Sequence, residues 1–352
     1  MPERVLTTRQ INRAVLARQL LLERSPLAPE RVVERVACLQ TQYAPAGYVG
    51  MWSRTDGFRR EHLTDALLSG RIVQGWAMRC TIHMLSARDY APISEAVRMP
   101  RREWWRRSAK SRAELPMEPV ADAVRGYLAD GPLKQAEIQK RLVADGFDRD
   151  AWSGAQLWVD LVRVPPAGTW ELPRAHVYGL AEQTVRTSAP SEPVARELLV
   201  TRYLRGFGPA SVKDVALFCG WNLTVTRAVL AGISLRRFRD ESGGELVDLP
   251  RAPLPDADTP APVRFLGQWD AVLLVHARRG QILPEAYRSR VFAATMPQSV
   301  PTFLVDGQVA GTWRFDGGGV ALDPFHELAP PVLRELAAEG ERLAAFASAA
   351  AG

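Results

Sequence analysis

The sequence predicts an α+β protein made of three tandem winged-helix domains, followed by a C-terminal β-barrel or sheet with a terminal helix. Two internal segments can be aligned with each other, and an N-terminal segment has the same order of elements. Near residue 250 a proline-rich stretch begins, and the pattern then changes to short strands. Because repeated supersecondary units indicate a modular architecture, we predict domains at residues 1–115, 116–190, 191–255 and 256–352.

The first domain is expected to contain three helices and then a strand pair. Residues 6–24 have apolar side chains at helical spacing, and Thr8 is the expected N-cap. A second helix is predicted from about Pro29, and a third to end at Gly70, a residue that suits the end of a helix. Residues 73–90 then alternate between two faces, as strands do.

The next two domains are predicted from their mutual alignment. Residues 120–147 and 194–221 each contain an apolar helix ending in Tyr-Leu, a Gly-Pro turn and a short amphipathic helix. A further helix and a glycine-centred hairpin follow in both. A short helix, a turn, a second helix and a wing are the elements of a DNA-binding winged helix. Tyr127 and Tyr203 are expected in the two cores.

The C-terminal part has strand-like runs at residues 263–277 and 301–315, divided by Gly and Asp turns. Val305-Asp306-Gly307-Gln308 predicts a tight hairpin turn. Residues 330–350 have the spacing of an amphipathic helix.

Composition and net charge limit the kinds of partner that the protein is expected to bind. The net charge is +6 and the isoelectric point is about 9.5, which favours an acidic polymer as partner. Arginine supplies nearly all of the positive charge, and a coding bias toward arginine explains that equally well. No apolar run approaches the roughly 20 residues of a membrane span, and the start lacks a signal core. We therefore expect a cytoplasmic monomer with no membrane contact.

Motifs for cofactor chemistry are absent from the sequence. It contains no GxGxxG, GxxxxGK[ST], GxSxG or HExxH pattern, and its five histidines are dispersed. Cys38, Cys80 and Cys219 fit neither a disulfide framework nor a zinc site. We expect no cofactor and no metal.

The segment ACLQTQYAP, residues 37–45, sets Gln40 and Gln42 one residue apart. On a regular helix two such side chains point in different directions. Pro45 disfavours helical geometry at Ala44, so we expect a helix to end here and the two amides to converge. Each amide has two donors and an acceptor oxygen, so the pair can hold a water molecule. The alternative is that both merely cap the last helical turn.

With LQTQ in the first domain, WAMRCTIHML as its wing, and VHARRGQILPEAYRSRVF and PTFLVDGQVAGTW in the tail, the chain resembles the winged-helix DNA glycosylases of the AlkZ/YcaQ family over nearly its whole length. The resemblance implies that Gln40 and Gln42 are the catalytic Gln-x-Gln pair. Thr41 departs from the family pattern, in which the middle residue is usually apolar.

The Gln-x-Gln form is similar to the AlkZ branch, which is associated with bacterial self-resistance to DNA-alkylating natural products. What the resemblance implies is excision of bulky N7-alkylguanines from double-stranded DNA, and it raises interstrand crosslinks as a further substrate. An N7-alkylated guanine carries positive charge and leaves readily, so positioned amides suffice to place the attacking water.

Five basic side chains are candidate DNA contacts. Two lie on one face of the predicted wing and three in the C-terminal part: Arg79, His83, His276, Arg288 and Arg290. The alternative for each is an ordinary solvated polar face. A further basic cluster surrounds Trp104-Trp105, and it either binds DNA or shields buried tryptophans.

Two other function classes remain open at this point. A non-catalytic winged-helix DNA-binding protein, such as a transcriptional regulator, predicts sequence-specific affinity and no abasic product. A protein-interaction scaffold predicts negligible affinity for DNA. A glycosylase predicts weak sequence preference and strand breakage by alkali on alkylated duplex.

Overall fold

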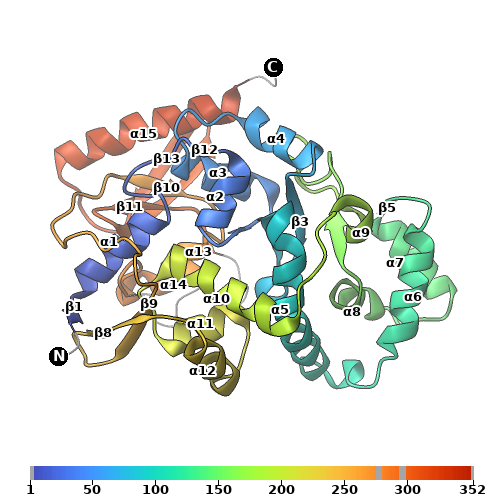
Figure 1. The fold of residues 1–352 in the computed structure, drawn as a ribbon. Helices are drawn as coiled ribbons and strands as arrows, with labels where there is room; N and C mark the ends of the chain where they lie inside the picture. The colour runs from blue at the N-terminus through green and yellow to red at the C-terminus, as the bar shows by residue number, and fades with distance from the viewer. Residues whose placement is uncertain (1–3, 275–279, 293–298, 350–352) are drawn as a thin grey trace.

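The computed structural model describes residues 4–274, 280–292 and 299–349 (Figure 1). Its first regular elements are β1 (Val5–Leu6) and α1 (Thr8–Arg18). Thr7, rather than the predicted Thr8, is the N-cap, because its hydroxyl accepts from the Gln10 backbone while the Gln10 side chain bonds back to it. The helix ends before the predicted residue 24. Leu20 has a positive φ of 57°, which a helix cannot accommodate.

One order of elements then occurs three times. The first unit comprises α2 (Pro29–Arg35), β2 (Leu39–Gln40), α3 (Ala44–Arg54), α4 (Arg60–Leu68), β3 (Ile72–Trp76) and β4 (Ile82–Ser86). The short strand β2 pairs with β4, and β4 pairs with β3, both antiparallel. The predicted helices from Pro29 and up to Gly70 are confirmed, and Gly70 has the left-handed φ of 70° expected after a helix.

The second and third units repeat this arrangement. The second comprises α6 (Met117–Leu128), β5 (Leu133–Lys134), α7 (Gln135–Ala144), α8 (Ala151–Trp158), β6 (Leu161–Arg163) and β7 (Val177–Leu180). The third comprises α10 (Glu192–Phe207), a single bridge at Ala210, α11 (Val212–Cys219), α12 (Leu223–Ala231), β8 (Arg236–Asp240) and β9 (Glu245–Asp248). In both, the first strand position pairs with the last strand of the hairpin.

The first two units share one sheet. Strand β3 pairs with β6 through Gln74 opposite Arg163 and Gly75 opposite Val162. The result is a six-stranded sheet in the order β2-β4-β3-β6-β7-β5. This pairing joins parts of the chain that the sequence assigned to separate domains.

Helix α5 (Ala87–Arg107) connects the first two units and packs against β3, α8 and α10 (Figure 1). The short helix α9 (Ala181–Thr184) follows β7. Tyr203 is fully buried, as predicted, whereas Tyr127 packs at the edge of the second core.

The C-terminal part is an open antiparallel sheet, not a closed barrel, among the residues that the structure describes. Its order is β10 (Arg264–Leu266), β11 (Thr302–Val305), β12 (Gln308–Asp316) and β13 (Gly319–Pro324), and helix α15 (Pro330–Ser348) packs on it (Figure 1). The predicted hairpin turn is confirmed, with positive φ at Asp306 and Gly307.

The strand expected over residues 263–277 is wrong between β10 and residue 274, and residues 275–277 lie outside the described part of the chain. The Asp270 carboxylate accepts a hydrogen bond from the Val272 backbone and starts the short helix α13 (Ala271–Leu274). The segment that follows forms the single turn η3 (Glu285–Tyr287) and the short helix α14 (Arg288–Val291).

Buried ion pairs fasten the parts of the chain together. Arg18 bonds Asp248 of β9 at 2.7 Å, and Arg54 of α3 bonds Asp270 at 2.8 Å, with all four side chains almost fully buried. Leu39 shares a hydrophobic core with Phe265, Phe303 and the α15 side chains. Within the described ranges, no helix combines the length and the apolar character needed to cross a membrane.

Candidate active site

Gln40 and Gln42 lie on an edge strand and the loop that follows it, not at the end of a helix as the sequence predicted. Helix α2 ends at Arg35, and the left-handed residues Ala37 (φ 61°) and Cys38 (φ 83°) turn the chain into β2. Gln40 lies in β2, and Gln42 lies in the bend that follows it. Both amides therefore come from one short segment at the edge of the sheet, and their convergence on one water stays a prediction.

Each amide is held by one protein donor. Arg79 Nη2 donates to Gln40 Oε1 at 3.0 Å, and the backbone N–H of Ile82 donates to Gln42 Oε1 at 3.1 Å. The Gln42 side chain thus occupies the position on β4 where the next backbone carbonyl of β2 would bind. Gln40 is 7% exposed and Gln42 is partly exposed. Each fixed carbonyl keeps one lone pair, and each amide group keeps its two N–H donors.

Between the two amides, Thr41 faces inward. Its backbone N–H donates to Ile82 O at 2.8 Å, its side chain is fully buried, and its hydroxyl has no hydrogen-bond partner among the described residues. The residue therefore occupies an apolar position.

Arg79 lies in the tight tip of the β3–β4 hairpin. Arg79 and Cys80 both have positive φ, 54° and 55°. Such conformations cost about 1–3 kcal/mol each and cluster at functional sites. Here the left-handed tip turns the Arg79 guanidinium back onto Gln40.

His83 is directly opposite Gln40 in the β2–β4 pairing, and it is 1% exposed. A ring nitrogen, Nδ1, lies 2.9 Å from Thr81 O. Burial, and secondarily the Arg79 charge, lower the pKa of His83 to about 3, so the imidazole is neutral at physiological pH. This corrects the expectation of a solvent-facing histidine: the ring supports the sheet beneath Gln40 and is not available to phosphate in this conformation.

The other predicted DNA contacts lie elsewhere. Arg288 and Arg290 are exposed on α14, where Arg288 is 3.4 Å from Glu285 and Arg290 is 3.5 Å from Asp323. The Arg290 guanidinium also lies 3.9 Å over the Phe325 ring. His276 lies outside the described residues. The structure brings Arg79 together with the glutamine pair, and the roles of the other residues stay predictions.

The residues of the Trp104-Trp105 cluster differ in how far they are buried. Trp105 is 2% exposed in the second core, and Arg102 lies 5.0 Å over the neighbouring Trp158 ring. Arg101 is buried and donates to the Trp76 carbonyl. The shielding alternative therefore holds for these residues. Trp104, in contrast, is 58% exposed.

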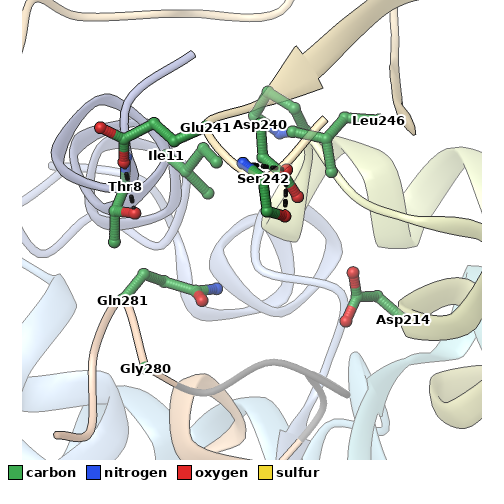
Figure 2. A pocket seen from close by; sticks show the side chains of 10 residues that line it. Thr8, Ile11, Asp214, Asp240, Glu241, Ser242, Leu246, Gly280 and Gln281 are labelled. Atoms are coloured by element: carbon green, nitrogen blue, oxygen red, sulfur yellow. Dashed lines mark hydrogen bonds between the residues drawn. The ribbon is translucent and has the colours of Figure 1, made fainter. Parts of the chain in front are cut away.

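A separate cavity of about 240 Å³ lies between α1 and the third hairpin (Figure 2). Its lining includes Asp214, Asp240 and Glu241. Thr8 donates to Glu241 from both its backbone and its hydroxyl, and these hydrogen bonds lower the pKa of Glu241. Figure 2 shows Ser242 bonded to Asp240. The carboxylates serve as local caps, and their negative charge makes this a poor surface for DNA.

The strand position of the glutamines was missed, although a signal existed. Residues 82–86 offered a partner strand, although burial does not alternate along Leu39, Gln40 and Thr41, which are all buried. The contact from Arg79 to Gln40 had no local signal, because the two residues are 39 positions apart.

The protein is therefore built from three helix–strand–helix–helix–hairpin units, and the first unit has a pair of glutamine amides at its strand edge. The chain belongs to the family of AlkZ-like DNA glycosylases, whose profile matches residues 33–346. It is 24% identical over 353 residues to an interstrand DNA cross-link repair glycosylase from Streptomyces sahachiroi, with 90% of each chain covered. The solved structure of the Streptomyces sahachiroi DNA glycosylase AlkZ has the same fold, with a TM-score of 0.80 and 21% identity over 98% of this chain and 97% of that one.

Proposed function

We propose that this protein is a monofunctional DNA glycosylase that removes N7-alkylguanine from double-stranded DNA by attack of water at C1′. Membership of the AlkZ-like family supports the reaction class. The single observation that supports the assignment of the site is the pair of amides on one strand edge, each with its carbonyl oxygen fixed by a protein donor.

The proposed reaction requires the protein mainly to position the attacking water. Alkylation at N7 leaves the purine with a positive charge, so breaking the N-glycosidic bond releases a neutral base. The sugar then develops oxocarbenium character, as in glycoside hydrolysis. A fixed dipole that places a water and faces the developing charge lowers the barrier without a strong base.

The two glutamines have different roles in this proposal. Gln42 is the more exposed, and its carbonyl retains a lone pair that accepts a hydrogen bond from the water, whose proton passes to solvent after attack at C1′. Gln40 is deeper, and the bond from Arg79 turns its NH₂ group away from the guanidinium, where it orients the water or contacts the deoxyribose. Thr41 between them keeps the strand anchored to β4.

The three repeated units are, in this proposal, winged helices that hold the duplex. Arg79, His276, Arg288 and Arg290 are proposed to contact its phosphates, and replacing any one of the three arginines with alanine should reduce the salt dependence of DNA binding by about 0.9 in log–log slope. The name of the Streptomyces relative supports interstrand crosslinks as substrates. The Gln-x-Gln pair supports the AlkZ branch, and with it a role in self-resistance to an alkylating natural product.

The test is a duplex with one N7-methylguanine, and a second with a bulky N7 adduct, incubated with the protein and then cleaved with alkali. The wild type should produce alkali-labile sites on alkylated strands only. Gln42→Ala should reduce the single-turnover excision rate by on the order of 10²-fold or more, the loss expected for a positioned proton acceptor.

Gln308→Ala is the matched control, because Gln308 is an exposed strand glutamine at the start of β12. It should excise at the wild-type rate. If Gln42→Ala also excises at that rate, the assignment of the amide pair fails. If tight, sequence-specific binding occurs without any abasic product, the protein is instead a non-catalytic DNA-binding protein.

A further inference from the structure

A cavity of about 230 Å³ lies beside the glutamine pair. It is enclosed by α5, by the tip of the β3–β4 hairpin and by the C-terminal end of α11. Its lining includes Trp104, Pro100, Cys80, Gly220, Arg79 and Arg101. Arg79 belongs to both places, since it lines this cavity and also donates to Gln40. A single side chain, Arg79, therefore links the cavity to Gln40 of the proposed active site.

The side chains that line the cavity favour a flat, uncharged group. Trp104 contributes an indole that is 58% exposed, whereas the adjacent Trp105 is 2% exposed. An exposed indole offers a stacking surface. Arg101 is 4% exposed and fixed by its bond to the Trp76 carbonyl, so its charge stays at the wall. Two guanidinium groups disfavour a cationic guest.

The volume of the cavity limits the size of the group that it can bind. Sites that hold whole small molecules have volumes of about 300–1,000 Å³. At about 230 Å³ this cavity is below that range, which suits a substituent rather than a whole ligand.

We propose that the Trp104 cavity receives the substituent on N7 of the damaged guanine, and that Trp104 selects flat, neutral aromatic substituents by stacking on them. This inference rests on the proposed glycosylase function. In guanine a single ring carbon separates N7 from N9, the atom bonded to C1′. A substituent on N7 therefore begins close to the reacting sugar atom, and a cavity that Arg79 links to Gln40 is placed to receive it. Trp104 is a specificity residue in this scheme and does not touch the reacting atoms.

The test measures affinity separately from excision. The full-length protein is titrated, at one fixed salt concentration, with two duplexes that carry a 2′-fluoro sugar at the lesion to slow bond cleavage. One contains N7-methylguanine, and the other contains guanine with a neutral polycyclic aromatic group on N7. The wild type should bind the aromatic adduct about tenfold more tightly, in line with the energy of one stacking contact.

Trp104→Ala should lose most of this preference while its affinity for the methyl duplex changes less than about twofold, and Trp104→Phe should retain most of it. Phe315→Ala is the matched control: Phe315 is a 43% exposed aromatic residue of β12 that does not line this cavity, and its loss should leave the preference intact. The inference is overturned if Trp104→Ala keeps the preference, if it weakens both duplexes equally, or if the wild type has none.

Excision on ordinary sugars is scored separately. A wild type that prefers the aromatic duplex but releases neither base leaves the cavity assignment standing and refutes the glycosylase. A wild type that excises both adducts without any preference refutes the cavity assignment alone.

Discussion

The first and second units have the same topology, yet only the first holds an amide pair at its strand edge. In the first, Leu39 and Gln40 pair with Met84 and His83; in the second, Leu133 and Lys134 pair with Tyr178 and Val177. The next backbone N–H donates across the sheet in both, from Thr41 to Ile82 O at 2.8 Å and from Gln135 to His176 O at 2.9 Å. These equivalent bonds allow the two units to be compared residue by residue.

The difference begins after that bond. In the second unit α7 starts at once, at Gln135. In the first unit three residues, Thr41 to Tyr43, separate β2 from α3, and this extension lets the Gln42 side chain return to the Ile82 backbone.

The hairpins differ as well. The first has a tight tip at residues 77–81 that turns Arg79 onto Gln40, whereas the second has a long loop at residues 164–176. A repeated fold thus gains a distinct site from a three-residue extension and one hairpin tip, which illustrates that function resides in sites placed on folds.

The largest effect is expected when the first unit receives the residue that the second unit has at the position equivalent to Gln40. Gln40→Lys places an ammonium group beside the Arg79 guanidinium and removes the amide that Arg79 holds. The single-turnover excision rate should fall by about 10²-fold, the usual cost of losing one preorganised polar group. The reciprocal Lys134→Gln, in the second unit, should excise at the wild-type rate. Equal loss in both variants would mean that the two strand edges are not functionally distinct.

The second prediction concerns the residue opposite Gln40. His83 has a pKa of about 3 in the folded protein, below the unfolded value of about 6.5, because burial disfavours its charged form. Its neutral form is fully compatible with folding above about pH 6.5. As the pH falls from 6.5 toward 3, unfolding gains a proton, so the free energy of unfolding should fall by about 1.4 kcal/mol per pH unit from this group.

His83→Val, which installs the residue found at the corresponding position of the second unit, should remove that slope. Urea unfolding at pH 7, 6 and 5 measures it in both proteins. An unchanged slope in the variant would assign the acid sensitivity to other groups.

The smallest expected effect is at Thr41. Its hydroxyl is buried without a partner among the described residues, and a polar group left unsatisfied costs about 1–3 kcal/mol. Thr41→Val has nearly the same shape and should raise the free energy of unfolding by about 1 kcal/mol while excision stays unchanged. A loss of stability on thermal or urea unfolding would indicate that the hydroxyl is satisfied in solution.

Local signals in the sequence were sufficient where local chemistry decides the structure. Pro29 starts a helix, Gly70 follows one, and Asp306-Gly307 forms a tight turn, because each residue fits the required backbone conformation by itself. The capping residue was predicted one position too late because Thr7 and Thr8 are chemically alike, and only the bond to Gln10 distinguishes them.

The parts that could not be predicted depend on partners far away in the chain. Strand β2 has two residues and exists only because β4 pairs with it. Gln40 and Gln42 were identified by residue type, but the bonds from Arg79 and from the Ile82 backbone, and the burial of His83, all arise from that pairing. The β10 run was read as longer because apolar residues suit a buried helix such as α13 as well as a strand.

The backbone ladder between β3 and β6 has a mechanical consequence. A hinge at this seam would have to break main-chain hydrogen bonds and expose the buried Gln74 and Arg163 side chains. The first two units therefore form one stiff platform. A change in the relative positions of the three units would have to come mainly from the chain that leads to the third unit.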